Sequence, residues 1–171
     1  MTLEQLLQGV AGAQVYGDKD TVLTGVCYHS GKLQPGNVFV AVRGLRSDGH
    51  TYLQSAVENG AAAVIVEKFQ PGLPVPQAVV PDSRKALAQA SANWYGNPSK
   101  SLRLVGVTGT NGKTTVTYLV KEILERAGRK VGLIGTNQNM VGNMVLKSDH
   151  TTPESLELQE LFSIMVREQV D

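Results

Sequence analysis

Two hydrophobic patterns follow one another along the chain: short continuous apolar runs, and apolar residues at helical spacing. Continuous runs at 38–42 and 61–66 predict buried strands of the kind found in parallel sheets. The Val- and Thr-rich stretch 21–28 and the brief run 78–80 predict two more strands. Helical spacing predicts five helices: 2–10, 52–60, 83–94, 116–127 and one opened by Thr152-Pro153 and running to about 166. Thr2 and Gln5 are spaced as a capping box for the first helix, and Asp82 or Ser83 is expected to cap the third. The order of these elements indicates an α/β fold.

The stretch 95–100 is the clearest boundary, because it combines a helix stop, an Asn-Pro turn signal and polar residues. It divides the chain into a small mixed α/β domain at 1–98 and the first part of a parallel-sheet domain at 99–171. In the second part, strands at 105–107 and 131–134 flank a helix and predict a βαβ unit. The loop-like stretch 135–149 has room for a short hairpin. Two parallel strands do not close a domain, so the sequence is expected to be truncated.

Composition points to an ordinary soluble, cytoplasmic protein. Sixteen basic and fifteen acidic residues leave a formal charge of +1 over 171 residues, and no charged run indicates nucleic acid or a membrane surface. The one cysteine, Cys27, has no partner for an internal disulfide and is expected to be a small buried hydrophobe. The N-terminus has no features of a signal peptide, and no apolar run reaches membrane-spanning length.

The stretch 105–115 has the residues expected of a phosphate-binding loop. Its sequence, Val-Gly-Val-Thr-Gly-Thr-Asn-Gly-Lys-Thr-Thr, runs from a predicted strand through a glycine-rich turn into a helix. Glycines let backbone N–H groups converge on an anion, and the helix adds its positive dipole end. Lys113 would reach the terminal phosphates, and the Thr114 hydroxyl would ligate magnesium. The strict G-x-x-x-x-G-K-[ST] pattern fails because Val107 stands at its first glycine, and the competing interpretation is an ordinary Gly-rich turn.

The order of several segments resembles the N-terminal part of the Mur ligases. The matching segments are 34–41 (Gln-Pro-Gly-Asn-Val-Phe-Val-Ala), 44–50 with its Asp-Gly-His end, 60–67, the loop 106–115 and 151–154 (Thr-Thr-Pro-Glu). The family's phosphate loop also lacks the first glycine. The resemblance covers nearly the whole chain, and it is the order and spacing of the segments that are specific.

The resemblance implies an ATP-dependent ligase of cell-wall peptidoglycan synthesis. Such enzymes make an acyl phosphate with ATP and Mg²⁺, and an incoming amine then attacks it. The implied substrates are a UDP-N-acetylmuramoyl dipeptide and a third amino acid, meso-diaminopimelate or L-lysine. Further catalytic groups of the family lie beyond residue 171, so this chain is expected to be inactive alone. The alternatives are a relative that adds D-alanyl-D-alanine, and a non-catalytic nucleotide- or UDP-sugar-binding module.

The resemblance also implies site residues. For ATP they are Gly109, Thr110, Asn111, Gly112, Lys113, Thr114 and Thr115, with Lys113 catalytic and Thr114 or Thr115 at Mg²⁺. For the UDP end they are Tyr28, Ser30, Leu45, Arg46 and Ser47, and for the muramoyl peptide Thr151 and Thr152.

Several of these residues have a simpler structural interpretation. The family usually has Asp-Ser-Arg where this chain has His29-Ser30-Gly31, so Ser30 competes with a turn role. Thr152 is suited to capping a helix. His50 lies in a family motif, yet a histidine that opens a helix is expected to be structural.

Overall fold

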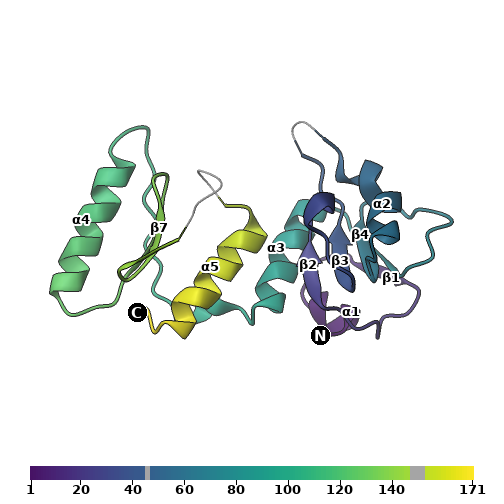
Figure 1. Cartoon of the computed structure of the whole chain (residues 1–171), viewed down its shortest axis with the longest axis horizontal. Helices are drawn as coiled ribbons and strands as arrows, with labels where there is room; N and C mark the ends of the chain where they lie inside the picture. Colours follow the sequence, from purple (N-terminus) through teal and green to yellow (C-terminus); the bar gives the residue numbers. More distant parts are fainter. Residues whose placement is uncertain (45–46, 147–152) are drawn as a thin grey trace. The chain divides into compact units, whose positions relative to one another are not determined.

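The computed structural model describes residues 1–44, 47–146 and 153–171. It contains two compact units, Met1–Trp94 and Tyr95–Asp171, each with its own sheet (Figure 1). The boundary predicted at 98/99 lies four residues after this division. In the described ranges, no helix combines the length and apolarity that crossing a membrane requires.

The first unit is built on a five-stranded sheet with the order β1-β5-β4-β3-β2. Strands β2 to β5 are parallel to their neighbours, and β1 pairs antiparallel with β5 at the edge. The strands are β1 (Gln14–Tyr16), β2 (Gly25–Cys27), β3 (Asn37–Val40), β4 (Ala63–Val66) and β5 (Gln77–Val79). The predictions of β2 to β5 are confirmed. The edge strand β1 was not predicted, because its three residues are half-exposed or exposed and give no apolar run.

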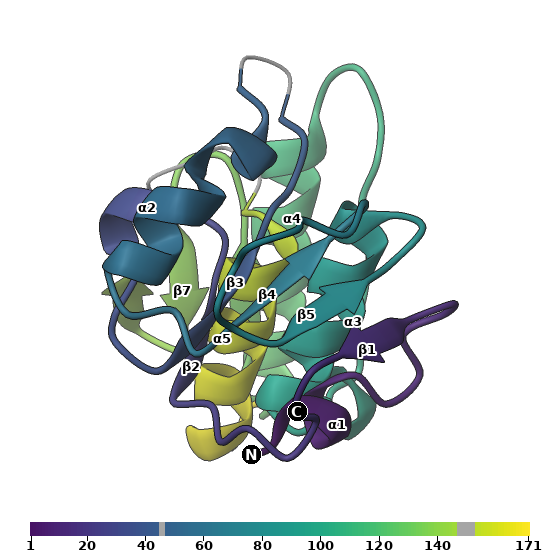
Figure 2. The same ribbon diagram turned by 90° about the vertical axis from the view of Figure 1, so that its right-hand side faces the viewer.

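Helices cover both faces of this sheet, which explains why every residue of β3 and β4 is buried. Figure 1 shows the sheet between α3 (Ser83–Trp94) and α2 (Leu53–Glu58), and Figure 2 looks onto the sheet from the side of α2. Successive strand residues point to opposite faces, so Phe39 and Val64 pack in one cluster with Leu53 of α2. The short helix α1 (Leu3–Leu6) packs against α3.

Side-chain caps fix where the helices of this unit begin. Thr2 and Gln5 form the predicted capping box of α1, with the Gln5 N–H donating to Thr2 Oγ1 at 3.3 Å and the Thr2 N–H donating to Gln5 Oε1 at 2.9 Å. Of the two predicted caps of α3, the structure has Asp82, whose Oδ1 accepts the N–H groups of Arg84 and Lys85. Two 3₁₀ turns, η1 (Ser30–Lys32) and η2 (Gly49–Tyr52), complete the unit.

The second unit holds a three-stranded antiparallel sheet with the order β6-β7-β8 and two long helices. Its elements are η3 (Pro98–Ser101), α4 (Lys113–Arg126), β6 (Gly132–Ile134), β7 (Asn139–Val141), β8 (Met144–Leu146) and α5 (Ser155–Arg167). The predicted helix before Gly128 and the predicted hairpin within 135–149 are confirmed as α4 and β7–β8.

Two predictions for this unit were wrong. Residues 105–107 form no strand, and β6 pairs antiparallel with β7, so the predicted βαβ unit is absent from the described residues. The physical reason is that an isolated extended segment has no ladder hydrogen bonds to hold it as a strand. Helix α5 begins at Ser155 rather than at Pro153, because the Glu154 carboxylate accepts the Ser155 N–H at 3.0 Å and caps the helix there.

Candidate functional site

The glycine-rich loop leads directly into a long helix, as a phosphate site requires. Gly109 and Gly112 have φ values of +150° and +77°, a region that side chains with a Cβ rarely adopt. Gly112 is the N-cap of the 14-residue helix α4, and no side chain caps the N–H groups of its first turn. The loop therefore offers uncapped backbone donors at the positive end of a helix dipole.

Lys113 is the first residue of α4, and its side chain is exposed. Its Nζ donates to the carbonyl oxygen of Gly109 at 2.5 Å and lies 3.5 Å from that of Thr110. The ammonium group thus folds back over the loop whose N–H groups would hold an anion. A phosphate bound in the loop would place negative charge beside the Lys113 ammonium. The phosphate would be a stronger hydrogen-bond acceptor for this cation than the neutral carbonyl is.

The predicted magnesium ligands lie in the first turn of α4. Thr114 is half-buried and Thr115 is exposed. Across the ranges the structure covers, no group of three His, Cys, Asp or Glu side chains is arranged to hold a metal ion. The Thr114 and Thr115 hydroxyls are hard oxygen ligands, so either would suit a Mg²⁺ whose other ligands come from phosphate and water.

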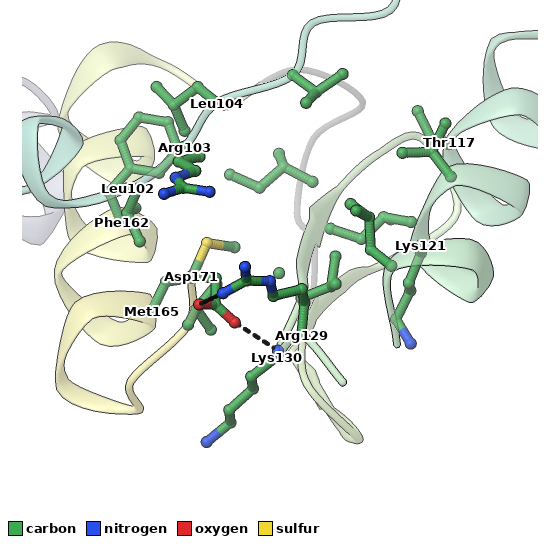
Figure 3. Close-up of a pocket in the computed structure, with 18 of the residues that line it drawn as sticks. Leu102, Arg103, Leu104, Thr117, Lys121, Arg129, Lys130, Phe162, Met165 and Asp171 are labelled. Carbon is green, nitrogen blue, oxygen red and sulfur yellow. Dashed lines mark hydrogen bonds and ion pairs between the residues drawn. The ribbon is translucent and has the colours of Figure 1, made fainter. Parts of the chain in front are cut away.

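A separate, largely apolar cavity of about 520 Å³ lies within the second unit. It is lined by residues 102–107, by α4, by β6 and the residues before it, and by α5 with the end of the chain (Figure 3). Asp171 lies at one edge of the cavity, where it accepts a hydrogen bond from Arg129 at 3.2 Å and one from the Lys130 N–H at 2.9 Å. None of residues 108–115 lines this cavity, so it is distinct from the phosphate loop.

In the first unit, the predicted UDP residues that the structure describes lie at the carboxyl ends of parallel strands. Tyr28 directly follows β2, Ser30 opens η1 and Ser47 lies in the loop after β3. Because β2 and β3 are parallel neighbours with Cys27 opposite Phe39, these segments leave the sheet at one edge. This is the edge at which open α/β sheets bind their ligands.

Leu45, Arg46, Thr151 and Thr152 lie outside the described residues. The arms on either side of 45–46 are tightly paired: the Gly44 N–H donates to the Ser47 carbonyl and the Gly49 N–H to the Val42 carbonyl, both at 2.9 Å.

Sequence reasoning missed a closed ring of polar contacts at the base of this loop. His50 Nδ1 lies 2.7 Å from Asp48 Oδ1, and His50 Nε2 accepts the Glu67 N–H at 3.1 Å. Arg43 Nε closes the ring, 3.4 Å from Asp48 Oδ2 and 3.3 Å from Glu67 Oε2. The available signal was Asp48-Gly49-His50, an Asx-type start of a helical turn.

The electrostatics of the ring follow from these contacts. The hydrogen bond from the His50 N–H, and then the one from its ring, hold the pKa of the Asp48 carboxyl below its ordinary value. Glu67 also reaches α3, where its Oε1 accepts the Ser83 hydroxyl at 2.9 Å and the Ser83 N–H at 3.2 Å. The ring thus ties the loop after β3 to the end of β4 and the start of α3.

Comparison with known families gives two matches that together span most of the chain. The Mur ligase family, catalytic domain, matches residues 22–95, and the Mur ligase middle domain matches residues 107–171. A UDP-N-acetylmuramoyl-L-alanyl-D-glutamate--2,6-diaminopimelate ligase of Caldanaerobacter subterraneus is 48% identical over 173 residues, 99% of this chain and 35% of that protein. Ligase 1 of the same name from Clostridium acetobutylicum is 45% identical over all of this chain and 36% of its own length.

Solved structures agree on the fold. A structure of a UDP-N-acetylmuramoyl-L-alanyl-D-glutamate--2,6-diaminopimelate ligase matches 99% of this chain and 34% of its own with a TM-score of 0.77 at 23% identity. The Thermotoga maritima MurF ligase in complex with ADP matches 83% of this chain and 30% of its own with a TM-score of 0.54 at 27% identity. The chain spans about a third of the length of these relatives. By both sequence and fold, the chain belongs to the Mur ligase family.

Proposed function

We propose that this chain is the part of an ATP-dependent ligase of peptidoglycan synthesis that binds the UDP end of the substrate and the phosphates of ATP. The ligase joins 2,6-diaminopimelate to UDP-N-acetylmuramoyl-L-alanyl-D-glutamate. This choice of amino acid rests on the names of the relatives that are 48% and 45% identical to this chain. The observation that carries the proposal is the loop at 109–112, with two glycines at positive φ leading into the uncapped start of α4.

The proposed reaction has two steps. The carboxylate of the muramoyl dipeptide attacks the terminal phosphorus of ATP, which releases ADP and leaves an acyl phosphate. The amine of the incoming amino acid then attacks the acyl carbon, an amide bond forms and phosphate leaves. Negative charge builds on the transferring phosphoryl group, and positioned cations and N–H donors lower the barrier by stabilising it.

In this proposal, residues 109–115 hold ATP. Backbone N–H groups of the loop bind the phosphates, and Lys113 swings from the Gly109 carbonyl onto them. Thr114 or Thr115 supplies a hydroxyl to Mg²⁺. The UDP end lies at the carboxyl edge of the first sheet, against Tyr28, Ser30 and the loop of Leu45, Arg46 and Ser47, and Thr151 and Thr152 contact the muramoyl peptide.

Calorimetric titration of the 171-residue chain tests the binding part of the proposal. We expect saturable heat with UDP and, separately, with Mg-ATP. Lys113→Ala should remove the Mg-ATP heat and leave the UDP heat unchanged. Lys100→Ala, which changes an exposed lysine of η3 outside the loop, is the matched control. A folded sample that gives no heat with either nucleotide would refute both sites.

A chimaera tests the ligase part. This chain replaces the matching segment of the Caldanaerobacter relative, and amide formation from ATP, UDP-N-acetylmuramoyl dipeptide and 2,6-diaminopimelate is measured. The expected result is ligation by the chimaera and by its Lys100→Ala variant, and loss of ligation in its Lys113→Ala variant. Wild-type turnover after Lys113→Ala would contradict the role given to this lysine.

A further inference from the structure

The ring of Arg43, Asp48, His50 and Glu67 lies at the base of the loop that the proposed function assigns to UDP. The loop leaves β3, and its two arms meet at an antiparallel bridge between Arg43 and Asp48. Beyond the bridge, the Gly44 N–H is held by the Ser47 carbonyl. Arg43 and Asp48 therefore belong to the ring and also form the paired base of the loop.

The tautomer of His50 follows from its two partners. Its Nε2 accepts a backbone N–H from Glu67, so this nitrogen carries no proton. The proton of the neutral ring is then on Nδ1, which donates it to Asp48 Oδ1. The His50 side chain is 14% exposed, so water is poorly placed to substitute for either partner. His50 thus needs both an acceptor on one side and a donor on the other.

The other half of the ring fixes the loop to the rigid part of the fold. Glu67 follows the fully buried strand β4, and its carboxylate is bound by Ser83 at the start of α3. Its second oxygen pairs with Arg43 on the first arm of the loop, and its N–H pairs with His50 after the second arm. Glu67, which directly follows a buried strand, therefore binds both arms of the loop.

We propose that this ring positions the two arms that flank the UDP-binding loop, residues 43–44 and 47–48, and that His50 is the positioning residue through which the second arm is held. The inference rests on the proposed function of the loop at 45–47. The ring does not contact the reacting atoms. It holds the flanking residues 43–44 and 47–48 in one geometry before the uridine nucleotide arrives, which lowers the ordering cost of binding.

Three substitutions of His50 separate its two contacts. In His50→Gln, the side-chain oxygen reaches the place of Nε2 and still accepts the Glu67 N–H. In His50→Asn, the amide reaches the place of Nδ1 and still donates to Asp48, but nothing accepts from Glu67. His50→Ala removes both contacts. Asn59→Ala, at the exposed end of α2, is the control substitution in the same unit.

The readouts are calorimetric titration with UDP and hydrogen exchange of individual backbone amides, both on the 171-residue chain. His50→Ala leaves the poorly hydrated Glu67 N–H without its acceptor. We expect this loss to weaken UDP binding by roughly tenfold. The Glu67, Gly44 and Gly49 amides should exchange faster in this variant, while the Ala41 amide, bonded to the Ile65 carbonyl, should not change. Mg-ATP affinity should stay as in the wild type. His50→Gln should recover most of the UDP affinity, and Asn59→Ala should match the wild type.

Unchanged amide exchange in His50→Ala would overturn the ring as a constraint on the loop. Faster exchange with wild-type UDP affinity would overturn its role in positioning. Equal losses of UDP and Mg-ATP affinity would show general unfolding and also overturn that role. A wild-type chain that gives no UDP heat would instead overturn the proposed function of the loop.

Discussion

Gly49 stands between Asp48 and His50, and the structure leaves no room there for a side chain. A Cβ added at this position would lie 2.7 Å from Val42 N, 2.8 Å from Val42 O and 3.0 Å from Ala41 C. All three are backbone atoms of buried residues. They cannot move aside cheaply, because the Ala41 N–H donates to the Ile65 carbonyl at 2.9 Å and the Gly49 N–H to the Val42 carbonyl at 2.9 Å.

The cost of Gly49→Ala can be worked out from these contacts. Overpacking against a buried backbone costs about 1–3 kcal/mol, and a lost hydrogen bond adds about 0.5–1.5 kcal/mol. For a chain of this length, each kcal/mol lowers Tm by roughly 2–4 °C. We therefore expect Gly49→Ala to melt roughly 5–15 °C below the wild type.

Thermal unfolding followed by circular dichroism measures this difference. Gly31→Ala is the matched control, because the closest atoms to its added Cβ are ring atoms of the exposed His29 at 3.3 and 3.4 Å, which can shift. The control should melt within about 2 °C of the wild type. A Gly49→Ala protein that melts as the wild type does would refute the close backbone approach, and with it the constrained geometry of the loop base.

Three further predictions concern other parts of the chain. Lys113→Ala should melt within about 2 °C of the wild type, because Lys113 is exposed and its Nζ hydrogen-bonds to carbonyls of its own loop, so a large drop in Tm would contradict a purely ligand-binding role. Asp82→Ala should lower the urea concentration at the midpoint of unfolding through loss of the α3 cap, and an unchanged midpoint would refute the cap. Burial, and then Glu160 and Glu157, raise the pKa of Tyr95 above its ordinary value of 10.0. Its contribution to stability is complete below pH 10 and is lost as the pH rises through the folded-state pKa, so Tyr95→Phe should flatten the pH dependence of Tm above pH 10.

The features that could be predicted from sequence are those that a few adjacent residues determine. The capping box at Thr2, the cap at Asp82 and the glycine-rich entry to α4 depend on local conformation, and the structure contains all three. The continuous apolar runs of β3 and β4 also predicted a sheet covered on both faces, because only such a sheet buries every strand residue.

The features that could not be predicted depend on residues far apart in the sequence. The strand expected at 105–107 requires a neighbouring strand, and no pattern within those residues says whether one is present. The ring of Arg43, Asp48, His50 and Glu67 likewise forms only once β3 and β4 are paired. Sequence alone showed a histidine at the start of a helical turn. The parallel pairing of the strands is what brings the Glu67 N–H to it.

Helix α4 shows the same distinction within one element. Its apolar spacing predicted the helix correctly, but the residues of that apolar face have different surroundings. Val120 and Leu124 line the apolar cavity of the second unit, whereas Val116, Leu119 and Ile123 are 43%, 58% and 65% exposed. A helical period indicates which face of a helix favours burial, while what covers that face depends on other segments. The phosphate-binding proposal does not depend on that cover, because its donors are the backbone of the loop and the first turn of α4, whose conformation is local.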